Sequence, residues 1–420
     1  MPNKIIGIIK CKSIVIKNVV WNFAGSMLST VILQLCVYPF IAKQHSEEDY
    51  GHIIFVMGII NIIILTIGNA LGDIRLTRDT KYTDADADEM GDFNVIITVG
   101  VALAGIITVL IFGVFGKVFN TTSLDVLITL PIVSMLGTLC SYLLSYFRLR
   151  LQFKEGVIES LFLALGYIIG IVLSFLVDVW TLPFLISYIF ANAYLIYKTG
   201  VFKEGFKRTS LCRGTVAEYS SLSLSYLIKS GMTYVDRFVI TPLLGAATLS
   251  VFTVSSIFGK SASIAIQPMA NVALGYYAQK NFKMTMKKYW ITNIVTILFG
   301  VLFYGVSLLL SAPFIHIFYP DYVDSAIRFI PISNISVILT AVAAMVQPAI
   351  LKYCKMAWQL VIQVVYGVIV VGLSCVLIPY FNLLGFCYAL IVANVCKLVI
   401  MLLVGDYNIR KHLQTLREDL

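Results

Sequence analysis

Charged residues are scarce in this 420-residue chain, where only 13% are Asp, Glu, Lys or Arg and 59% are hydrophobic. Soluble domains carry roughly 25% charged residues, so the composition excludes an ordinary soluble globular protein. Acidic residues are the scarcer of the two signs, and their shortage leaves a formal net charge of +9. These proportions indicate a membrane protein with many spans.

Metal-binding and redox signatures are also missing. The four histidines are scattered along the chain and indicate no metal site. The eight cysteines contain no CxxC pair, so small buried apolar thiols are the better interpretation. Gly259-Lys260-Ser261 resembles the end of a Walker A box, but Val254 stands where that box requires Gly, which excludes ATP hydrolysis. We expect no catalytic residue, no metal and no cofactor.

Twelve apolar stretches of about 20 residues run through the chain, and a helix of that length crosses a hydrocarbon core of roughly 30 Å. The predicted fold class is therefore all-α integral membrane with twelve transmembrane helices. The spans are predicted near 19–42, 52–72, 94–115, 125–147, 157–177, 181–197, 218–241, 247–278, 289–311, 327–351, 358–380 and 384–404.

The positions of Lys and Arg predict the topology. With a cytoplasmic N-terminus and alternating sides, only Lys43, Lys117 and Arg328 fall in outer segments. Positive charge is retained on the cytoplasmic side, so both termini are predicted to be cytoplasmic. The basic excess then reflects topology and attraction to anionic membrane lipids, and it does not indicate nucleic acid. The outer loops are short, which leaves no appended soluble domain.

Short motifs recur at a spacing of about 200 residues and indicate an internal repeat. The pairs are 115–119 with 314–318, 131–132 with 331–332, and 191–192 with 393–394. We therefore predict two pseudo-symmetric six-helix lobes, related by an axis along the membrane normal, that rock around a central site. The predicted segments are an interfacial cytoplasmic N-terminus 1–18, an N-lobe 19–199, a basic cytoplasmic linker 200–217, a C-lobe 218–404 and a cytoplasmic tail 405–420.

Charges inside the predicted spans are mostly cationic: Lys229, Arg237 and Lys260 are opposed by Asp236 alone. A lysine at bilayer depth costs about 2.5–3.5 kcal/mol on insertion scales, so these residues are functional candidates for holding an anion. A tight turn near 244–246 would place Lys229 and Lys260 nearly level on antiparallel helices. The alternative is a structural ion-pair network around Asp236.

Polar residues also recur at helical spacing in the first helix of each predicted lobe. These residues are Asn22, Ser26 and Gln34 in the first span, and Tyr226 and Lys229 in the seventh. They predict a cavity lining, while interhelical hydrogen bonding in a dry interface is the alternative. Arg75, beside Asp73, either guards a cytoplasmic entrance or is an ordinary topology charge.

Several segments resemble bacterial polysaccharide-export flippases of the O-antigen type, in the multidrug/oligosaccharidyl-lipid/polysaccharide (MOP) superfamily. The resemblance is carried by Glu218-Tyr-Ser-Ser-Leu, Tyr234-Val-Asp-Arg-Phe-Val-Ile240, Leu244-Gly245, Phe252 and Gln267-Pro268, with weaker echoes at 46–51, 317–326 and 351–355. It implies a two-lobed alternating-access transporter of undecaprenyl-pyrophosphate-linked oligosaccharide in the bacterial inner membrane. It also implies a cationic central cavity, carried here by Lys229, Arg237 and Lys260, and a polysaccharide polymerase complex as a further partner.

Two other functions remain open from the sequence. The first is a cation-coupled multidrug exporter of the same superfamily, which would want a membrane-buried carboxylate in the first half. The first span has none, and Glu159 lies near an inner end of its span. The second is an integral-membrane polysaccharide polymerase or acyltransferase, which would need a large outer loop or clustered His, Asp or Glu. The short outer loops argue against this second function.

Overall fold

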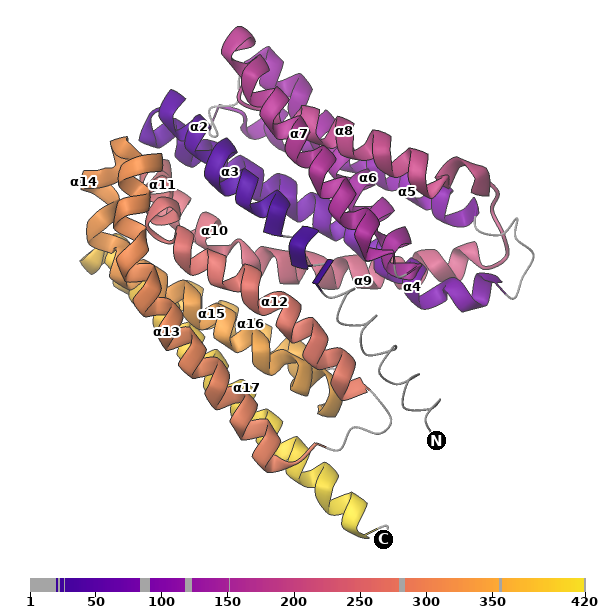
Figure 1. The fold of residues 1–420 in the computed structure, drawn as a ribbon, viewed down its shortest axis with the longest axis vertical. Coiled ribbons are helices and arrows are strands. Elements are labelled where there is room, and N and C mark those ends of the chain that lie inside the picture. The colour runs from indigo at the N-terminus through magenta and orange to yellow at the C-terminus, as the bar shows by residue number, and fades with distance from the viewer. Residues whose placement is uncertain are drawn as a thin grey trace, which may run out of the picture. The chain divides into compact units, whose positions relative to one another are not determined.

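The computed structural model describes residues 20–21, 23–25, 27–83, 91–117, 123–150, 152–278, 284–354 and 357–418, and regular structure in these ranges is helical throughout (Figure 1). Nine helices in the described ranges are long and apolar enough to cross a membrane. They are Phe23–Gln44, Glu47–Arg78, Gly91–Phe115, Leu124–Leu149, Phe153–Val177, Met286–Phe318, Pro320–Tyr353, Val361–Phe381 and Leu383–Gln414. The chain is a multi-pass helical membrane protein.

The other three predicted spans are not among these nine helices. Residues 181–197 correspond to α8, and each of the predicted spans 218–241 and 247–278 is divided into two helices. The first division falls at Tyr234 and the second at Ser256, where the backbone leaves helical geometry. Just beyond the first division, the Asp236 carboxylate accepts the Arg237 backbone N–H at 3.0 Å, a local bond that competes with a continuing helix. Twelve crossings therefore stay a prediction.

The chain divides into two compact units, residues 1–45 with 52–235, and residues 46–51 with 236–420. The first unit contains α9, which packs against α4 and η2, so its C-terminal limit lies beyond the predicted linker. The lobe boundaries predicted from the repeat stay a prediction.

The elements of the first unit are η1 (Leu33–Val37), α2 (Tyr38–Gln44), α3 (Glu47–Ile64, from His52), η2 (Leu65–Asn69), α4 (Ala70–Thr83), α5 (Gly91–Phe115), α6 (Leu124–Leu149), α7 (Phe153–Val177), α8 (Leu182–Thr199), η4 (Val201–Glu204) and α9 (Cys212–Thr233).

Helix α6 lies at the centre of the first unit, in contact with α4, α5, α8 and η2. Helices α7 and α8 run side by side (Figure 1). Their backbones approach closely at Gly166, where a Cβ atom would lie only 2.4 Å from the Cα of Ser187. The elements η1 and η2 are π-helical turns, a form that is rare and frequently marks functional sites.

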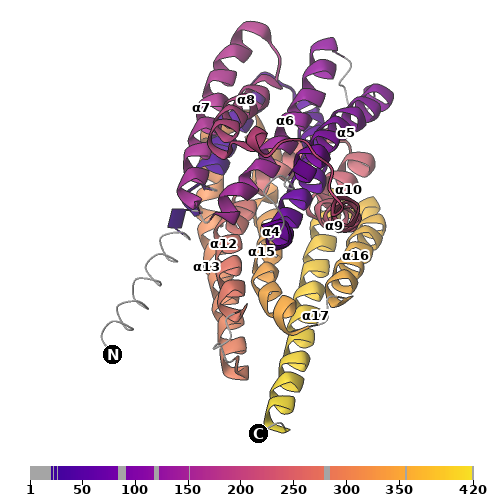
Figure 2. The same cartoon turned by 90° about the vertical axis from the view of Figure 1, so that its right-hand side faces the viewer.

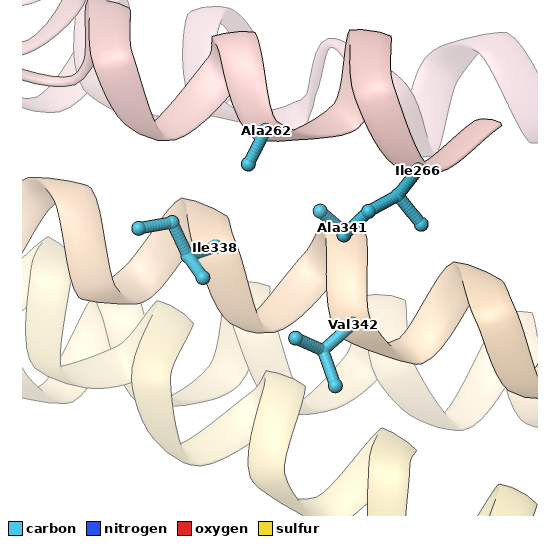
Figure 3. Packing of buried hydrophobic residues seen from close by; sticks show 5 residues of the cluster. All are labelled: Ala262, Ile266, Ile338, Ala341 and Val342. Carbon is cyan, nitrogen blue, oxygen red and sulfur yellow. The ribbon is translucent and has the colours of Figure 1, made fainter. Parts of the chain in front are cut away.

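The second unit is organised around α15, which packs against α12, α13 and α17. Ala262 and Ile266 of α12 form a buried apolar cluster with Ile338, Ala341 and Val342 of α15, and Figure 3 shows Ala262 and Ile266 on the side of α12 that faces α15. Figure 2 shows α16 and α17 side by side. The elements are α10 (Val235–Leu244), α11 (Ala246–Ser255), α12 (Ile257–Ala278), α13 (Met286–Phe318), η5 (Pro320–Tyr322), α14 (Val323–Ala326), η6 (Ile327–Phe329), α15 (Ile330–Tyr353), α16 (Ala357–Phe381) and α17 (Leu383–Glu418).

The predicted tight turn at 244–246 is confirmed. A single residue, Gly245, separates α10 from α11, with φ at +87°. Side chains with a Cβ atom rarely adopt that conformation, so glycine fits the turn at little cost.

Candidate functional site

The first unit contains an open pocket of about 450 Å³. Asn69 of the π-helical η2, Ser141 and Arg148 of α6, and Glu159 of α7 supply polar groups to its lining. Aromatic and apolar side chains complete it, among them those of Trp21, Leu144, Phe147, Phe153, Leu163, Tyr188 and Tyr234. A mostly apolar cavity of this size with a few converging polar groups is typical of small-molecule sites.

Glu159 is the buried acidic group of this cavity, with 3% of its surface exposed. Its carboxylate accepts two long hydrogen bonds, from the Cys140 thiol at 3.5 Å and the Ser160 hydroxyl at 3.4 Å. No described residue forms an ion pair with it. An ionised carboxylate that is so weakly satisfied is costly to bury, so this position favours a bound proton, a bound cation or a donor group of a ligand.

A chain of polar contacts crosses from Arg148, at the same cavity, to α9. The Arg148 guanidinium lies 3.3 Å from the Asp73 carboxylate, and the Tyr226 hydroxyl donates a hydrogen bond to the other oxygen of Asp73. Tyr226 was predicted to contact substrate, and the structure gives its hydroxyl an acceptor inside the first unit. A substrate contact by Tyr226 stays a prediction.

Arg75 is held in a buried polar network. Only 2% of it is exposed, and its guanidinium donates hydrogen bonds to the hydroxyls of Tyr142 (2.8 Å) and Tyr146 (2.6 Å) and to Glu204 (2.6 Å). The guanidinium also lies 3.8 Å from the centroid of the Tyr146 ring. These contacts connect α4 and α6 to η4, so Arg75 holds the start of the predicted linker 200–217 against the first unit. Its predicted role at an entrance stays a prediction.

A second network ties α9 to α4 and α5. Arg78 of α4 makes a forked ion pair with Glu218 of α9 and donates to Thr215 at 2.8 Å. The Tyr82 hydroxyl bridges Thr215 at 2.7 Å and Asp92 of α5 at 3.0 Å. Burial raises the pKa of Tyr82 to about 12, so the hydroxyl stays neutral near pH 7. The N-terminal part of α9 is therefore attached to α4 and α5 of the first unit.

Of the predicted cations, Arg237 and Lys260 lie in the second unit with Asp236. The Lys260 ammonium is 3.1 Å from the Asp236 carboxylate, which is 9% exposed and also accepts the Arg237 backbone N–H. Lys229 lies in the first unit, exposed on α9, with its ammonium 5.8 Å from the centroid of the Tyr226 ring. The ion-pair alternative thus fits Lys260, while substrate binding by these four residues stays a prediction.

Gln34 lies in the π-helix η1, and it is partly buried. Asn22 and Ser26 lie outside the described residues, so their predicted cavity role has no structural counterpart here. Sequence reasoning gave Asn69 and Ser141 no role and treated Glu159 only as a residue near a span end. A carboxylate in an otherwise apolar stretch was a usable signal for Glu159, because such residues in membranes usually face a polar interior.

Comparison with protein-family models gives no match, and comparison with curated protein sequences also gives none. Solved structures do match over nearly the whole chain. An inward-facing multidrug resistance MATE family transporter of the MOP superfamily is similar at a TM-score of 0.70 and 12% identity, covering 95% of this chain and 96% of that one.

Two further solved structures are informative. A MOP superfamily transporter from Pyrococcus furiosus, described as having a binding pocket of reverse polarity, matches at a TM-score of 0.69 and 13% identity, covering 94% of this chain and 96% of that one. The lipid II flippase MurJ in an inward closed conformation matches at a TM-score of 0.66 and 13% identity, covering 92% and 87%. The chain therefore has the fold of MOP superfamily transporters.

Proposed function

We propose that this chain is a flippase that moves undecaprenyl-pyrophosphate-linked oligosaccharide across the bacterial inner membrane during surface polysaccharide biosynthesis. Its structural neighbours are transporters, and one of them is a lipid II flippase, so the fold is compatible with a lipid-linked substrate. The fold is equally compatible with multidrug export, because other neighbours are MATE transporters. The fold alone does not distinguish a flippase from a multidrug exporter, so the side chains of the candidate site have to do so.

The observation that carries the proposal is the polar face of α9. Ser221, Ser225, Lys229 and Thr233 are all exposed and recur every four residues, which places them on one side of the helix. No described carboxylate pairs with Lys229. Because an unpaired lysine against hydrocarbon is costly, this face is better explained as the wall of a water-filled path.

Apolar side chains lie beside that polar face. Leu224 and Leu227 are 60% and 46% exposed, and Ile228 is also exposed. A lipid-linked glycan needs both kinds of surface. Stripping its hydroxyls of hydrogen bonds would cost several kcal/mol each, so the head requires a polar route while the tail stays in contact with apolar groups.

The ammonium of Lys229 suits the pyrophosphate as a point charge, which binds without the fixed geometry of a guanidinium fork. An inside-negative membrane potential favours outward movement of the anion by about 2.3 kcal/mol per charge per 100 mV. A single cation of this kind attracts the phosphates without holding them so tightly that release stalls.

Complementation of a flippase-deficient strain tests the proposal. Lys229→Ala should lower surface glycan at least tenfold at normal protein abundance, while Lys229→Arg should keep export if charge alone matters. Lys352→Ala, which removes another exposed cation, is the matched control and should export normally. Normal export by Lys229→Ala would remove the proposal, and joint loss of glycan and protein would assign Lys229 a structural role instead.

A cation-coupled exporter is the second candidate, and Glu159 favours it. The sequence argument against this function was that the first span has no membrane-buried carboxylate and that Glu159 lies near the end of its span, yet Glu159 is 3% exposed and lines the first unit's cavity. A carboxylate at such a site can exchange a proton or cation as its surroundings change.

Proteoliposomes containing the purified protein separate the two candidates. If the exporter assignment is right, an imposed pH gradient drives uptake of an organic cation dye, and Glu159→Gln abolishes it while Lys229→Ala does not. If the flippase assignment is right, the protein accelerates translocation of a fluorescent polyprenyl-pyrophosphate glycan, Lys229→Ala abolishes this activity, and no dye moves.

A further inference from the structure

Two asparagines in the wall of the first unit's pocket have hydrogen-bonding groups to spare. Asn61 lies on α3 and Asn69 on η2, which continues α3, and both side chains are partly buried. No described residue hydrogen-bonds the Asn61 side chain. The Asn69 amide oxygen accepts the Ser141 hydroxyl at 2.5 Å, while its NH₂ group has no acceptor among the described residues. These two side chains therefore offer a ligand one amide oxygen and two NH₂ groups.

A phenol hydroxyl adds to these amides. Tyr188 of α8 lines the same pocket, and within the described ranges its hydroxyl has no hydrogen-bond partner. The ring carbon that carries this hydroxyl lies beside Gly137 of α6, another lining residue, where a Cβ atom would come within 3.2 Å of it. The hydroxyl end of the ring therefore borders the pocket, where it can both donate and accept.

Glu159 supplies the strongest acceptor of the set. Its two hydrogen bonds, at 3.5 and 3.4 Å, are longer than ordinary ones, so its oxygens can take further donors. Arg148 also lines the pocket, but its guanidinium pairs with Asp73 at 3.3 Å. The polar part of the wall is therefore a mixture of donors and acceptors rather than a patch of one charge.

This mixture fits a neutral ligand that carries many hydroxyls. Each sugar hydroxyl both donates and accepts, so one ring can serve NH₂ groups, a phenol and a carboxylate together. An organic cation would suit Glu159 but would bring no acceptor to the NH₂ groups of Asn61 and Asn69. A ligand that displaces water from such groups loses affinity unless it replaces the hydrogen bonds.

The remainder of the wall suits the faces of a sugar ring. Trp21, Phe147 and Phe153 are among the aromatic lining residues. A pyranose carries apolar C–H groups between its hydroxyls, so it can pack on aromatic side chains while its hydroxyls reach polar ones. The volume of about 450 Å³ also lies within the range of roughly 300–1,000 Å³ that is typical of small-molecule pockets.

We propose that this pocket is a sugar subsite, in which Asn61, Asn69 and Glu159 hydrogen-bond the hydroxyls of one sugar residue of the transported glycan. Tyr188 contributes its hydroxyl to the same sugar. The inference rests on the proposed function for the identity of the glycan, whereas the sugar chemistry rests on the pocket itself.

Binding of a free oligosaccharide to the purified full-length protein tests the proposal. The probe is the oligosaccharide released by mild acid from the lipid-linked glycan that accumulates in the flippase-deficient strain. Saturation-transfer NMR should show that its ring protons contact the protein. Asn61→Ala, Asn69→Ala and Glu159→Gln should each weaken binding about fivefold, because each removes or weakens hydrogen bonds to the sugar. Asn408→Ala is the matched control in the second unit, where the amide donates to the Val404 carbonyl of its own helix, and it should bind normally.

A sugar-free probe separates this inference from the proposed function. Undecaprenyl pyrophosphate should bind less well to Lys229→Ala and normally to Asn61→Ala, and the free oligosaccharide should show the reverse pattern. If Lys229→Ala binds undecaprenyl pyrophosphate normally while Asn61→Ala still weakens the oligosaccharide, the proposed function fails and the sugar subsite stands.

Three results would overturn the sugar subsite. The first is that the oligosaccharide does not bind at all. The second is unchanged binding in the asparagine variants or in Tyr188→Phe, which removes only a hydroxyl and keeps the test decisive if an asparagine variant does not fold. The third is displacement of the oligosaccharide by tetraphenylphosphonium that disappears in Glu159→Gln, which would assign the pocket to an organic cation instead.

Discussion

The two units of the molecule are stabilised by different interactions. In the first unit, buried or half-buried charges connect elements far apart in the chain, as in Arg75 with Glu204 and Arg78 with Glu218. In the described part of the second unit, apolar clusters along α15 dominate, and the main interhelical ion pair is Lys260 with Asp236. The unit that carries the cavity and the linker is thus also the one that relies on exact charge pairing.

Beneath this difference the two units share details that support the internal repeat. Asn192 of α8 donates to the Leu136 carbonyl of α6 at 2.9 Å, and Asn394 of α17 donates to the Ser336 carbonyl of α15 at 2.9 Å. The two described non-glycine residues with positive φ are Asp178 and Asn382, at the ends of α7 and α16. These matching contacts fit the predicted repeat of helix hairpins, which stays a prediction, whereas the charge networks described above lie in the first unit.

The largest expected effect tests the charge network. Arg75→Ala would leave Glu204 and two tyrosine hydroxyls without their buried cation, and breaking a buried pair in this way costs about 3–5 kcal/mol. Thermal unfolding of the purified protein should show a large loss of stability. Lys260→Ala is the comparison in the second unit, and because Lys260 is partly exposed its loss should be smaller. Equal losses would contradict the contrast between the units.

Close helix packing should be equally sensitive in both units. Gly166→Ala would place a methyl group 2.4 Å from a backbone atom of α8, and Gly385→Ala would place one 2.3 Å from the Leu377 carbonyl oxygen. Overpacking of this kind typically costs about 1–3 kcal/mol. Gly372→Ala has nothing within 4 Å and serves as the control, expected to be neutral or slightly stabilising. A neutral result for only one of the two tight glycines would break the equivalence of the hairpins.

The repeated asparagines give a finer test. Asn192→Ala and Asn394→Ala each remove a side-chain hydrogen bond to a neighbouring helix, which is worth about 1 kcal/mol. Similar losses in unfolding midpoint are expected, with Asn192 the larger because its amide also donates to the Tyr188 carbonyl at 2.8 Å. A loss confined to one variant would show that only one unit uses the amide for stability.

How much of the fold could be predicted from the sequence depends on how far apart in the chain the residues that determine each feature lie. Apolar runs are local, so the helical membrane class and nine of the twelve predicted spans followed from composition and length. The turn at Gly245 was also local. The breaks at Tyr234 and Ser256 were not evident from the sequence, which was interpreted as one continuous helix at each place.

The candidate site was harder to predict because its contacts are non-local. Arg75 and Glu204 are 129 residues apart, and Arg78 and Glu218 are 140 apart, so no spacing rule could pair them. The membrane-depth argument identified Asp236, Arg237 and Lys260 as unusual, and two of these do form an ion pair. It overlooked Glu159, whose burial depends on how α7 packs against α6 and α8.

The smallest expected effect lies at the exposed end of the second unit. Arg410 and Asp406 form an i,i+4 ion pair on α17, with 63% of the Arg410 side chain exposed. Solvent-exposed pairs at this spacing contribute about 0.3–0.5 kcal/mol, because water already screens the charges and ordering two side chains costs entropy. Arg410→Ala should therefore leave the unfolding midpoint almost unchanged, and added salt should abolish what difference remains. A loss approaching that of Arg75→Ala would mean that the second unit also depends on charge pairing.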